Sequence, residues 1–209
     1  MSPRFSIIIP HYDKVVTDER FLECIQSLKD QTFKDFEVLI YHDGPVSRPL
    51  PEVPWKVKVT EKRIGDWGHS LRSQGIKEAS GDYIVHLNAD GILFPDALEY
   101  IDEFSTEQCS LLDYTNPDLI VFPVYMQGVV LNGIGYTRNP DFEEYQIILT
   151  GFPPEQNNID CMQLVMKRNI WLKEGAWDLR TQDSDGQMYP YFILKYKARY
   201  CGKVLGIHR

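Results

Sequence analysis

The sequence predicts an α/β fold in which helices flank a mostly parallel central sheet. Through the first half of the chain, short β-branched apolar runs alternate with segments of helical periodicity. That alternation is typical of parallel sheets covered by helices on both faces. The chain has 209 residues, enough for one sizeable core and short for two domains. We therefore expect a single domain over residues 1–209.

The elements of the first half follow from apolar spacing and turn residues. An apolar run bounded by prolines predicts a strand over residues 5–9. Helical spacing predicts a helix over residues 17–29, capped by Thr17 or Asp18. The other elements expected here are strands over residues 36–41, 56–60 and 83–87, a helix over residues 67–79, and a helix that starts near Pro95.

The second half is less regular. Strands are expected over residues 118–125, 129–137, 146–149 and 199–207, and a helix over residues 184–197. Residues 157–168 are expected to form a loop that enters a strand or a short helix. Some of these strands are expected to form a small second sheet.

Charge and apolar content exclude several classes of protein. The net charge of −8 argues against nucleic-acid binding, because a duplex repels an acidic surface. The longest apolar stretch, residues 119–126, contains Pro123 and is too short to span a bilayer. Four widely spaced cysteines without a CxxC pair indicate reduced thiols. We expect a soluble, cytoplasmic protein without a transmembrane segment.

One segment carries the strongest functional signal. The apolar strand at residues 83–87 runs into the polar turn Asn88-Ala89-Asp90. An acid at the carboxyl end of a buried strand faces the crevice in which α/β proteins bind ligands. Carboxylate oxygens in that position suit a hard cation that is bound to a diphosphate. This turn therefore favours an enzyme that uses a nucleotide sugar.

Four segments, in order, resemble the inverting GT-A glycosyltransferases of family 2. The segments are residues 5–12; residues 28–40 with His42-Asp43-Gly44; residues 68–76 with residues 79–84; and Asn88-Ala89-Asp90 at the position of the DxD motif. The chain is also similar in general character to virus-encoded glycosyltransferase domains. The resemblance implies a Rossmann-like nucleotide-sugar-binding half to about residue 104 and an acceptor-binding half from about residue 105, within a chain that is either complete or part of a longer protein.

The sequence departs from the family pattern at three positions. Asn88 replaces the first acid of DxD, His42 replaces the first of two paired aspartates, and Ser73 replaces an asparagine. Asn88 can hydrogen-bond a ribose hydroxyl but brings no charge. Asp90 is then the one carboxylate of this motif that is available to a metal.

The resemblance also implies a catalytic set. Mn²⁺ or Mg²⁺ would be held by Asp90 and by His208, although a turn acid and a solvated tail histidine are the structural alternatives. The base that deprotonates the acceptor would be Asp185, with Asp183 as the alternative and a helix cap as the structural reading of either. A helix N-terminus would keep this base ionised at neutral pH. One base opposite the leaving group implies inversion at the anomeric carbon.

Donor-binding residues are carried over from the motif positions. Pro10, His11 and Tyr12 would hold the base, Asp43 would accept the uracil imide proton, and Trp177 would stack on a sugar unless it lies in the core. The full donor-binding set implied by the resemblance is Pro10, His11, Tyr12, Asp13, Asp43, Asp66, Gly68, Arg72, Asn88, Ala89, Asp90 and Trp177.

The expected activity is transfer of a hexose from a UDP-sugar, of the UDP-glucose or UDP-rhamnose type, to a hydroxyl of a glycan. The alternative is an inactive domain that binds nucleotide sugars or glycans, which the loss of an acid at Asn88 favours. A dinucleotide-binding dehydrogenase and a P-loop kinase are excluded because GxGxxG and GxxxxGK[ST] are missing. A sugar-nucleotide pyrophosphorylase would need a glycine-rich basic loop after its first strand.

Overall fold

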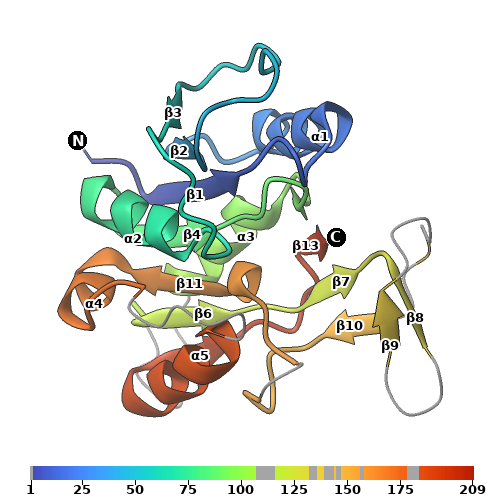
Figure 1. Ribbon diagram of the computed structural model, residues 1–209. Helices are drawn as coiled ribbons and strands as arrows, with labels where there is room; N and C mark the ends of the chain where they lie inside the picture. Colours follow the sequence, from blue (N-terminus) through green and yellow to red (C-terminus); the bar gives the residue numbers. More distant parts are fainter. Residues whose placement is uncertain are drawn as a thin grey trace.

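The computed structural model describes residues 2–106, 116–131, 136–138, 144, 147–155, 158–177 and 184–209. Within them, a seven-stranded sheet in the order β12-β6-β11-β4-β1-β2-β3 is flanked by helices (Figure 1). A four-stranded sheet, β10-β7-β13-β5, lies beside it, and β8 pairs with β9. The predicted α/β class with a small second sheet is confirmed.

The elements have the following bounds. The large sheet contains β1 (Phe5–His11), β2 (Phe36–His42), β3 (Val57–Val59), β4 (Tyr83–His86), β6 (Leu119–Val121), β11 (Leu164–Lys167) and β12 (Ala198–Tyr200). The other strands are β5 (Ile92–Leu93), β7 (Val124–Met126), β8 (Val129–Leu131), β9 (Tyr136–Arg138), β10 (Ile147–Leu149) and β13 (Gly206–His208). The helices are α1 (Asp18–Lys29), α2 (His69–Glu78), α3 (Ala97–Thr106), η1 (Cys161–Gln163), α4 (Arg168–Lys173) and α5 (Ser184–Lys195).

Strand direction brings four segments to one edge of the large sheet. β1 pairs in parallel with both β2 and β4. β11 pairs with β4 in the antiparallel direction. The carboxyl ends of β1, β2 and β4 therefore lie at the same edge as the amino end of β11, where η1 precedes it. In open α/β sheets this edge is where ligands bind.

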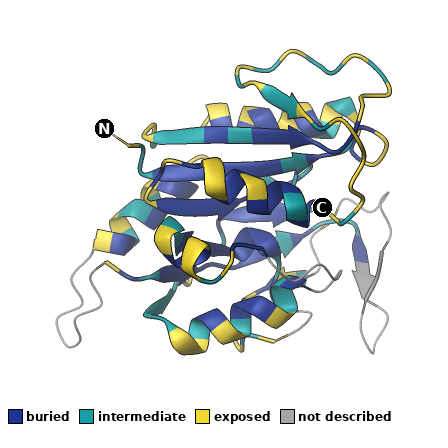
Figure 2. Ribbon diagram, turned by 60° about the vertical axis from the view of Figure 1, so that its left-hand side comes forward, coloured by how far each residue is buried: buried dark blue, intermediate teal, exposed yellow. Residues whose placement is uncertain are grey.

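The middle of the sheet is the core of the molecule. Ile7, Ile8 and Ile9 of β1 are fully buried, as are Ile84 and Val85 of β4. Figure 2 shows the central strands as the most continuously buried elements, while exposed residues gather on the outer faces of the helices. Burial on both faces explains why these strands are continuous apolar runs rather than alternating ones.

Two predicted strands are each divided in the structure. The expected strand at residues 118–125 breaks at Pro123, so that β6 joins the large sheet and β7 the small one. Proline lacks the N–H that a central ladder requires. The expected strand at residues 199–207 likewise becomes β12 and β13, again in different sheets. Strand β5 was not predicted, because two residues carry no periodic signal.

Helix α2 begins two residues later than predicted. Its first residue is His69, and Gly68 is its N-cap with φ of 81°. Trp67 has φ of 55°. Both values lie in the left-handed region, so neither residue can continue a right-handed helix. The cap of α1 is as expected, since the Thr17 side chain accepts a hydrogen bond from the N–H of Arg20.

The described part of the chain holds no helix that is long and apolar enough to cross a membrane. Cys24, Cys161 and Cys201 are free and buried. Cys109, the remaining cysteine, lies outside the described residues.

Gly75 is the position at which α2 approaches β1 most tightly. A Cβ added there would lie 2.6 Å from Cγ2 of the fully buried Ile8. We expect Gly75→Ala to destabilise the fold by about 1–2 kcal/mol, because overpacking a stiff β-branched side chain outweighs the gain in helix propensity. Urea unfolding measures this loss. Gly202→Ala is the control, since a Cβ there meets nothing within 4 Å; equal midpoints for the two variants would contradict the packing argument.

Candidate functional site

A cavity of about 370 Å³ opens at the edge where β1, β2 and β4 end. Its size is within the range of small-molecule sites. Most of the predicted donor-binding residues line it. The lining residues are Pro10, His11, Tyr12, Val15, Val16, Asp43, Arg63, Gly65, Trp67, Gly68, Leu71, Arg72, Asn88, Ala89 and Asp90.

The end of β1 forms an aromatic wall of this cavity. The His11 ring stacks on Phe21 with centroids 4.3 Å apart. Burial, with a smaller effect of His42, lowers the pKa of His11 to about 4, so the imidazole is neutral at pH 7. The guanidinium of Arg63 lies 4.3 Å from the centroid of the Tyr12 ring. This wall therefore presents a neutral imidazole and a phenol ring that is covered on one face.

Asp13 lies behind the wall rather than in it. Its Oδ2 accepts hydrogen bonds from the N–H and the hydroxyl of Ser47, at 2.6 and 2.8 Å. Burial alone would raise the pKa of Asp13, but the bonds from Ser47 and the charge of His42 lower it to about 2. Asp13 thus anchors the proline-rich loop, and the predicted contact with uracil or ribose has no support in this position.

His42, which stands where the family has an aspartate, is also structural. The side chain is fully buried. Its Nδ1 lies 2.6 Å from the carbonyl oxygen of Gly44, and its Nε2 lies 3.3 Å from the N–H of Asp13. Nδ1 therefore donates to the carbonyl oxygen of Gly44, while Nε2 faces Asp13, whose Oδ1 lies 3.4 Å away. His42 therefore shapes the turn after β2.

Two further acids hold the segment that closes the cavity. Asp43 lines the cavity and accepts hydrogen bonds from the N–H groups of Ile64 and Gly65, at 2.7 and 3.0 Å. Asp66 is not in the wall. Its Oδ2 accepts hydrogen bonds from the N–H and the hydroxyl of Ser70 in the first turn of α2. Asp66 therefore stabilises the start of the helix, and its place in the donor-binding set stays a prediction.

Arg72 connects the cavity wall to the core. Its NH1 donates to the carbonyl oxygen of Trp67 at 2.8 Å, and its NH2 donates to Oδ1 of Asn88 at 2.7 Å. The guanidinium lies 5.2 Å from the ring centroid of Trp177. Trp177 is fully buried and stacks on Trp171, with centroids 5.5 Å apart. The indole of Trp177 therefore lies in the core, the structural alternative that the sequence left open, and supports Arg72 there.

The sequence did not point to Asp160, yet this acid forms a polar cluster with His208 and Asn88. Its Oδ2 is 3.3 Å from Nδ1 of His208, and Nδ2 of Asn88 is 3.1 Å from the same nitrogen. Burial alone would raise the pKa of Asp160, but the adjacent His208 imidazole and the N–H of Met162 hold it well below its ordinary value. The available signal was the pair Asp160 and Gln163, which forms the capping box of η1.

Asp90 lines the cavity, and His208, which is not among the lining residues, lies close enough to interact with its charge. Burial raises the pKa of Asp90, while His208, Arg20 and Arg209 oppose this rise. A carboxylate and an imidazole are donors that suit Mn²⁺ or Mg²⁺ when phosphate oxygens complete the coordination. The described residues contain no group of three or more metal-binding side chains.

Asp185 occupies the first turn of α5, close enough to this cluster to interact with its charges. Burial and the negative charge of Asp160 raise the pKa of Asp185 to about 6, against the N–H of Gly186 and the charge of Arg72. The helix N-terminus is therefore not the dominant influence that we expected. The carboxylate is still mostly ionised at pH 7. Asp183, the alternative base, lies outside the described residues.

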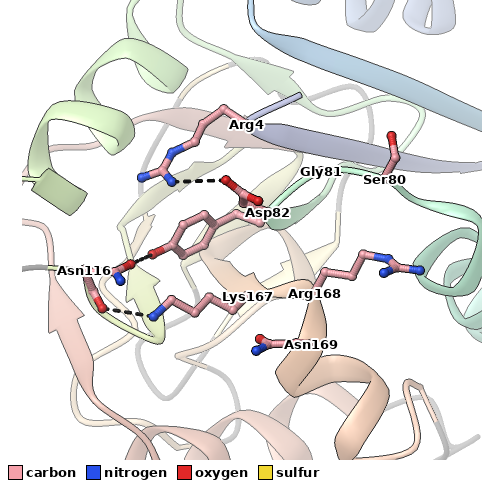
Figure 3. Close-up of a pocket in the computed structure, with 9 residues that line it drawn as sticks. Arg4, Ser80, Gly81, Asp82, Asn116, Lys167, Arg168 and Asn169 are labelled. Carbon is pink, nitrogen blue, oxygen red and sulfur yellow. Dashed lines mark hydrogen bonds and ion pairs between the residues drawn. The ribbon is translucent and has the colours of Figure 1, made fainter. Parts of the chain in front are cut away.

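A second cavity, of about 470 Å³, lies at the opposite edge of the large sheet. Arg4 pairs there with Asp82, and Lys167 donates to the carbonyl oxygen of Asn116 (Figure 3). Arg4 also pairs with Asp102, and Lys167 with Asp118. Arg168 donates to the carbonyl oxygens of Ile76 and Lys77 at the end of α2. The basic side chains that line this second cavity therefore join structural elements to one another.

Comparison with known proteins identifies relatives of this chain. The model of the family described as "Glycosyl transferase family 2" matches residues 6–171. An uncharacterized glycosyltransferase of Rickettsia typhi is 30% identical over 183 residues, which cover 85% of this chain and 54% of that protein. The amylovoran biosynthesis glycosyltransferase AmsE of Erwinia amylovora is 29% identical over 103 residues, covering 46% of this chain and 38% of that protein.

Solved structures share the fold. TarS 1-349 of S. aureus, in complex with UDP-GlcNAc, has a TM-score of 0.66 and 17% identity over 98% of this chain and 58% of that chain. The mannosyltransferase PcManGT of Pyrobaculum calidifontis, in complex with GDP-Man and Mn²⁺, has a TM-score of 0.64 and 12% identity over 100% of this chain and 57% of that chain. The present chain thus spans little more than half of each. At these identities the likeness concerns the fold alone.

The charge of Asp160 is expected to contribute, after burial, to the raised pKa of Asp185. We expect Asp160→Asn to lower the pKa of Asp185 below about 6, because it removes a nearby negative charge, while burial continues to raise the pKa. The asparagine oxygen can still accept the cap bond from Met162. A carbon-13 NMR titration of the aspartate carboxyls measures the shift. Asp30→Asn, at an exposed carboxylate, is the control; a pKa that stays near 6 in Asp160→Asn would contradict the assignment of its cause.

Proposed function

The chain belongs to glycosyl transferase family 2, and on that premise we propose that it transfers a hexose from a UDP-sugar to a hydroxyl group of a glycan. The observation that carries the proposal is the cavity at the carboxyl edge of the sheet. Asp90 lies in the acidic turn that lines this cavity, and Asp185 lies close enough to the lining residue Arg72 to interact with its charge. The pKa of Asp185, about 6, suits proton transfer at neutral pH. A cavity at this edge of an α/β sheet, with these two acids, fits transfer from a nucleotide sugar.

The nucleotide-sugar class of donor is supported by the neighbours in fold, which were solved with UDP-GlcNAc and with GDP-Man. Uracil, in preference to cytosine, which has no imide N–H, is proposed from Asp43. Its carboxylate lines the cavity and is fixed by two backbone N–H groups. A fixed carboxylate accepts an imide N–H without the entropic cost of being ordered by the ligand. UDP-glucose and UDP-rhamnose are the donors that we propose.

A divalent cation, Mn²⁺ or Mg²⁺, would be held by Asp90 and His208 and would neutralise charge on the leaving diphosphate. The chain's own contribution is to position these donors. Asp160 and Asn88 contact Nδ1 of His208, which fixes the plane of the ring and directs Nε2 to serve as the ligand. Arg72 fixes Asn88 in turn. The PcManGT complex with Mn²⁺ supports a metal in this fold.

Asp185 is proposed as the base that removes the proton from the acceptor hydroxyl. A pKa near 6 makes its carboxylate more basic than an ordinary aspartate and still leaves it mostly ionised at pH 7. Attack by the activated hydroxyl on the face opposite the diphosphate inverts the configuration at the anomeric carbon. Asp183 stays the alternative base.

The second candidate is a domain that binds nucleotide sugars or glycans without turnover. The observation that favours it is Asn88, which leaves Asp90 as the one acid of its turn. The raised pKa of Asp185 argues against this candidate. A carboxyl whose pKa is raised to about 6 by burial and a neighbouring charge is typical of a site that transfers protons. Turnover distinguishes the two candidates.

The proposed base gives a test of both. We expect the wild-type protein to release nucleotide from a UDP-sugar when glycan acceptors are supplied, in a screen that also includes GDP- and dTDP-sugars. Asp185→Asn should lower kcat by at least about a hundredfold while UDP still binds, because general-base catalysis is worth roughly that factor. The kcat/KM of the wild-type protein should decrease as the pH is lowered through about 6, because Asp185 becomes protonated there.

The outcomes separate cleanly. If wild type binds UDP but no donor in the screen turns over, the binding-domain candidate replaces the enzyme. If Asp185→Asn turns over at a normal rate, the base is assigned elsewhere, first to Asp183.

The metal site is tested through nucleotide affinity rather than turnover. We expect UDP to bind more tightly with Mn²⁺ than with a chelator, and Asp90→Ala to weaken binding about tenfold or more, since a lost charged contact is worth roughly 1.5–3 kcal/mol. His208→Ala should weaken Mn²⁺ more than the nucleotide. Calorimetry measures both affinities. Equal UDP affinity in manganese and in excess chelator would contradict a metal at this site.

A further inference from the structure

Trp67 has a backbone conformation that a bulky residue rarely adopts. Its φ is 55°, between Gly65 at 72° and Gly68 at 81°. In the left-handed region the Cβ of an L-residue crowds the neighbouring carbonyl, which costs roughly 1–2 kcal/mol for a residue other than glycine. Glycine would meet no such cost at position 67. The fold thus keeps a tryptophan where the backbone favours glycine.

Residues of the cavity hold this conformation in place. NH1 of Arg72 donates to the carbonyl oxygen of Trp67 at 2.8 Å. Asp43 accepts a hydrogen bond from the N–H of Gly65 at 3.0 Å. On the other side, a Cβ at Gly68 would lie 2.6 Å from Cβ of Pro10, so this backbone is packed against the cavity floor. The strained backbone is therefore fixed by the same residues that form the site.

The strained conformation does not serve to bury the indole. Trp67 lines the cavity and is 59% exposed, whereas Trp171 and Trp177 are fully buried. Leaving a large apolar ring in water forgoes the free energy that its burial would contribute. Strain and exposure at one residue have no structural return in the free protein. Strain of this kind gathers at ligand-binding sites, where the surroundings hold it.

We propose that Trp67 is a stacking platform for the nucleobase of the donor, a role that rests on the proposed use of a nucleotide sugar. We place the nucleobase, rather than the sugar, on Trp67 because Asp43 anchors Gly65 of the same segment. Asp43 is the proposed acceptor for the imide N–H of the nucleobase. An indole offers a rigid apolar face at low entropic cost and stacks on the flat face of any base. Trp67 therefore contributes affinity for the nucleotide, and Asp43 the choice of base.

Two substitutions at this position separate binding from folding. Trp67→Gly removes both the ring and the backbone strain, so the melting temperature should stay equal or rise while UDP affinity falls about tenfold or more. Trp67→Phe keeps a stacking face and should bind UDP within a few-fold of wild type. Trp55→Phe is the matched control, because Trp55 packs beside Phe36 and does not line the cavity. Calorimetry with UDP and GDP and thermal unfolding provide the measurements.

The probes distinguish the reasons for failure. If wild type binds neither UDP nor GDP, the proposed function fails. If wild type binds UDP and Trp67→Gly binds it equally well, the platform is refuted. A loss seen with UDP-GlcNAc but not with UDP would also refute it, because the ring would then contact the sugar. A fall in melting temperature with unchanged UDP affinity would make Trp67 a structural residue.

Discussion

The hydrogen bonds of one buried guanidinium, that of Arg72, hold the candidate site together. Arg72 is 4% exposed and donates to Trp67, Asn88 and Cys161, which lie on three separate segments. All three acceptors are neutral, so none of them neutralises the positive charge of Arg72. That charge acts on the carboxylates nearby, and its contribution to the pKa values of Asp160 and Asp185 is a lowering one. A buried charge is costly unless it is bonded and balanced. Here neutral residues accept the hydrogen bonds of Arg72, and separate carboxylates balance its charge. One side chain can therefore fix both the shape and the charge of the site.

The arrangement around Arg72 explains why the chain can have Asn88 where the family motif has an acid. A carboxylate at position 88 would pair directly with Arg72, whose NH2 lies 2.7 Å from Oδ1 of Asn88. It would also repel Asp160, since both side chains reach Nδ1 of His208. Asn88 keeps the hydrogen bonds and removes the repulsion. The negative charge beside His208 then comes from Asp160, which enters from the amino end of β11 because that strand runs antiparallel to β4.

Sequence patterns predicted this fold and much of the wall of the cavity because those features are local. Buried parallel strands read as apolar runs, and the residues after them must meet at one edge. Asp90 follows from that rule, whereas Pro10 and Asp43 were carried over from the family resemblance. Asp160 does not follow from it, because its role depends on an antiparallel strand whose direction no local pattern encodes. The sequence could not choose between a sugar contact and the core for Trp177, since an aromatic residue after a short helix shows its burial only once the surrounding elements have packed.

The left-handed turn before α2 shows how stability and binding compete within a single segment. Periodicity extended the helix through Trp67, and a helix there would have been the relaxed conformation. The structure instead bends the chain at Trp67 and Gly68, so that Arg72 can reach the Trp67 carbonyl from the first turn of α2. That bond is local and fixes the loop against the helix that follows it. The segment thereby presents its indole to the cavity without a hinge, and the strain in its backbone is balanced by a charged donor that the site already needs.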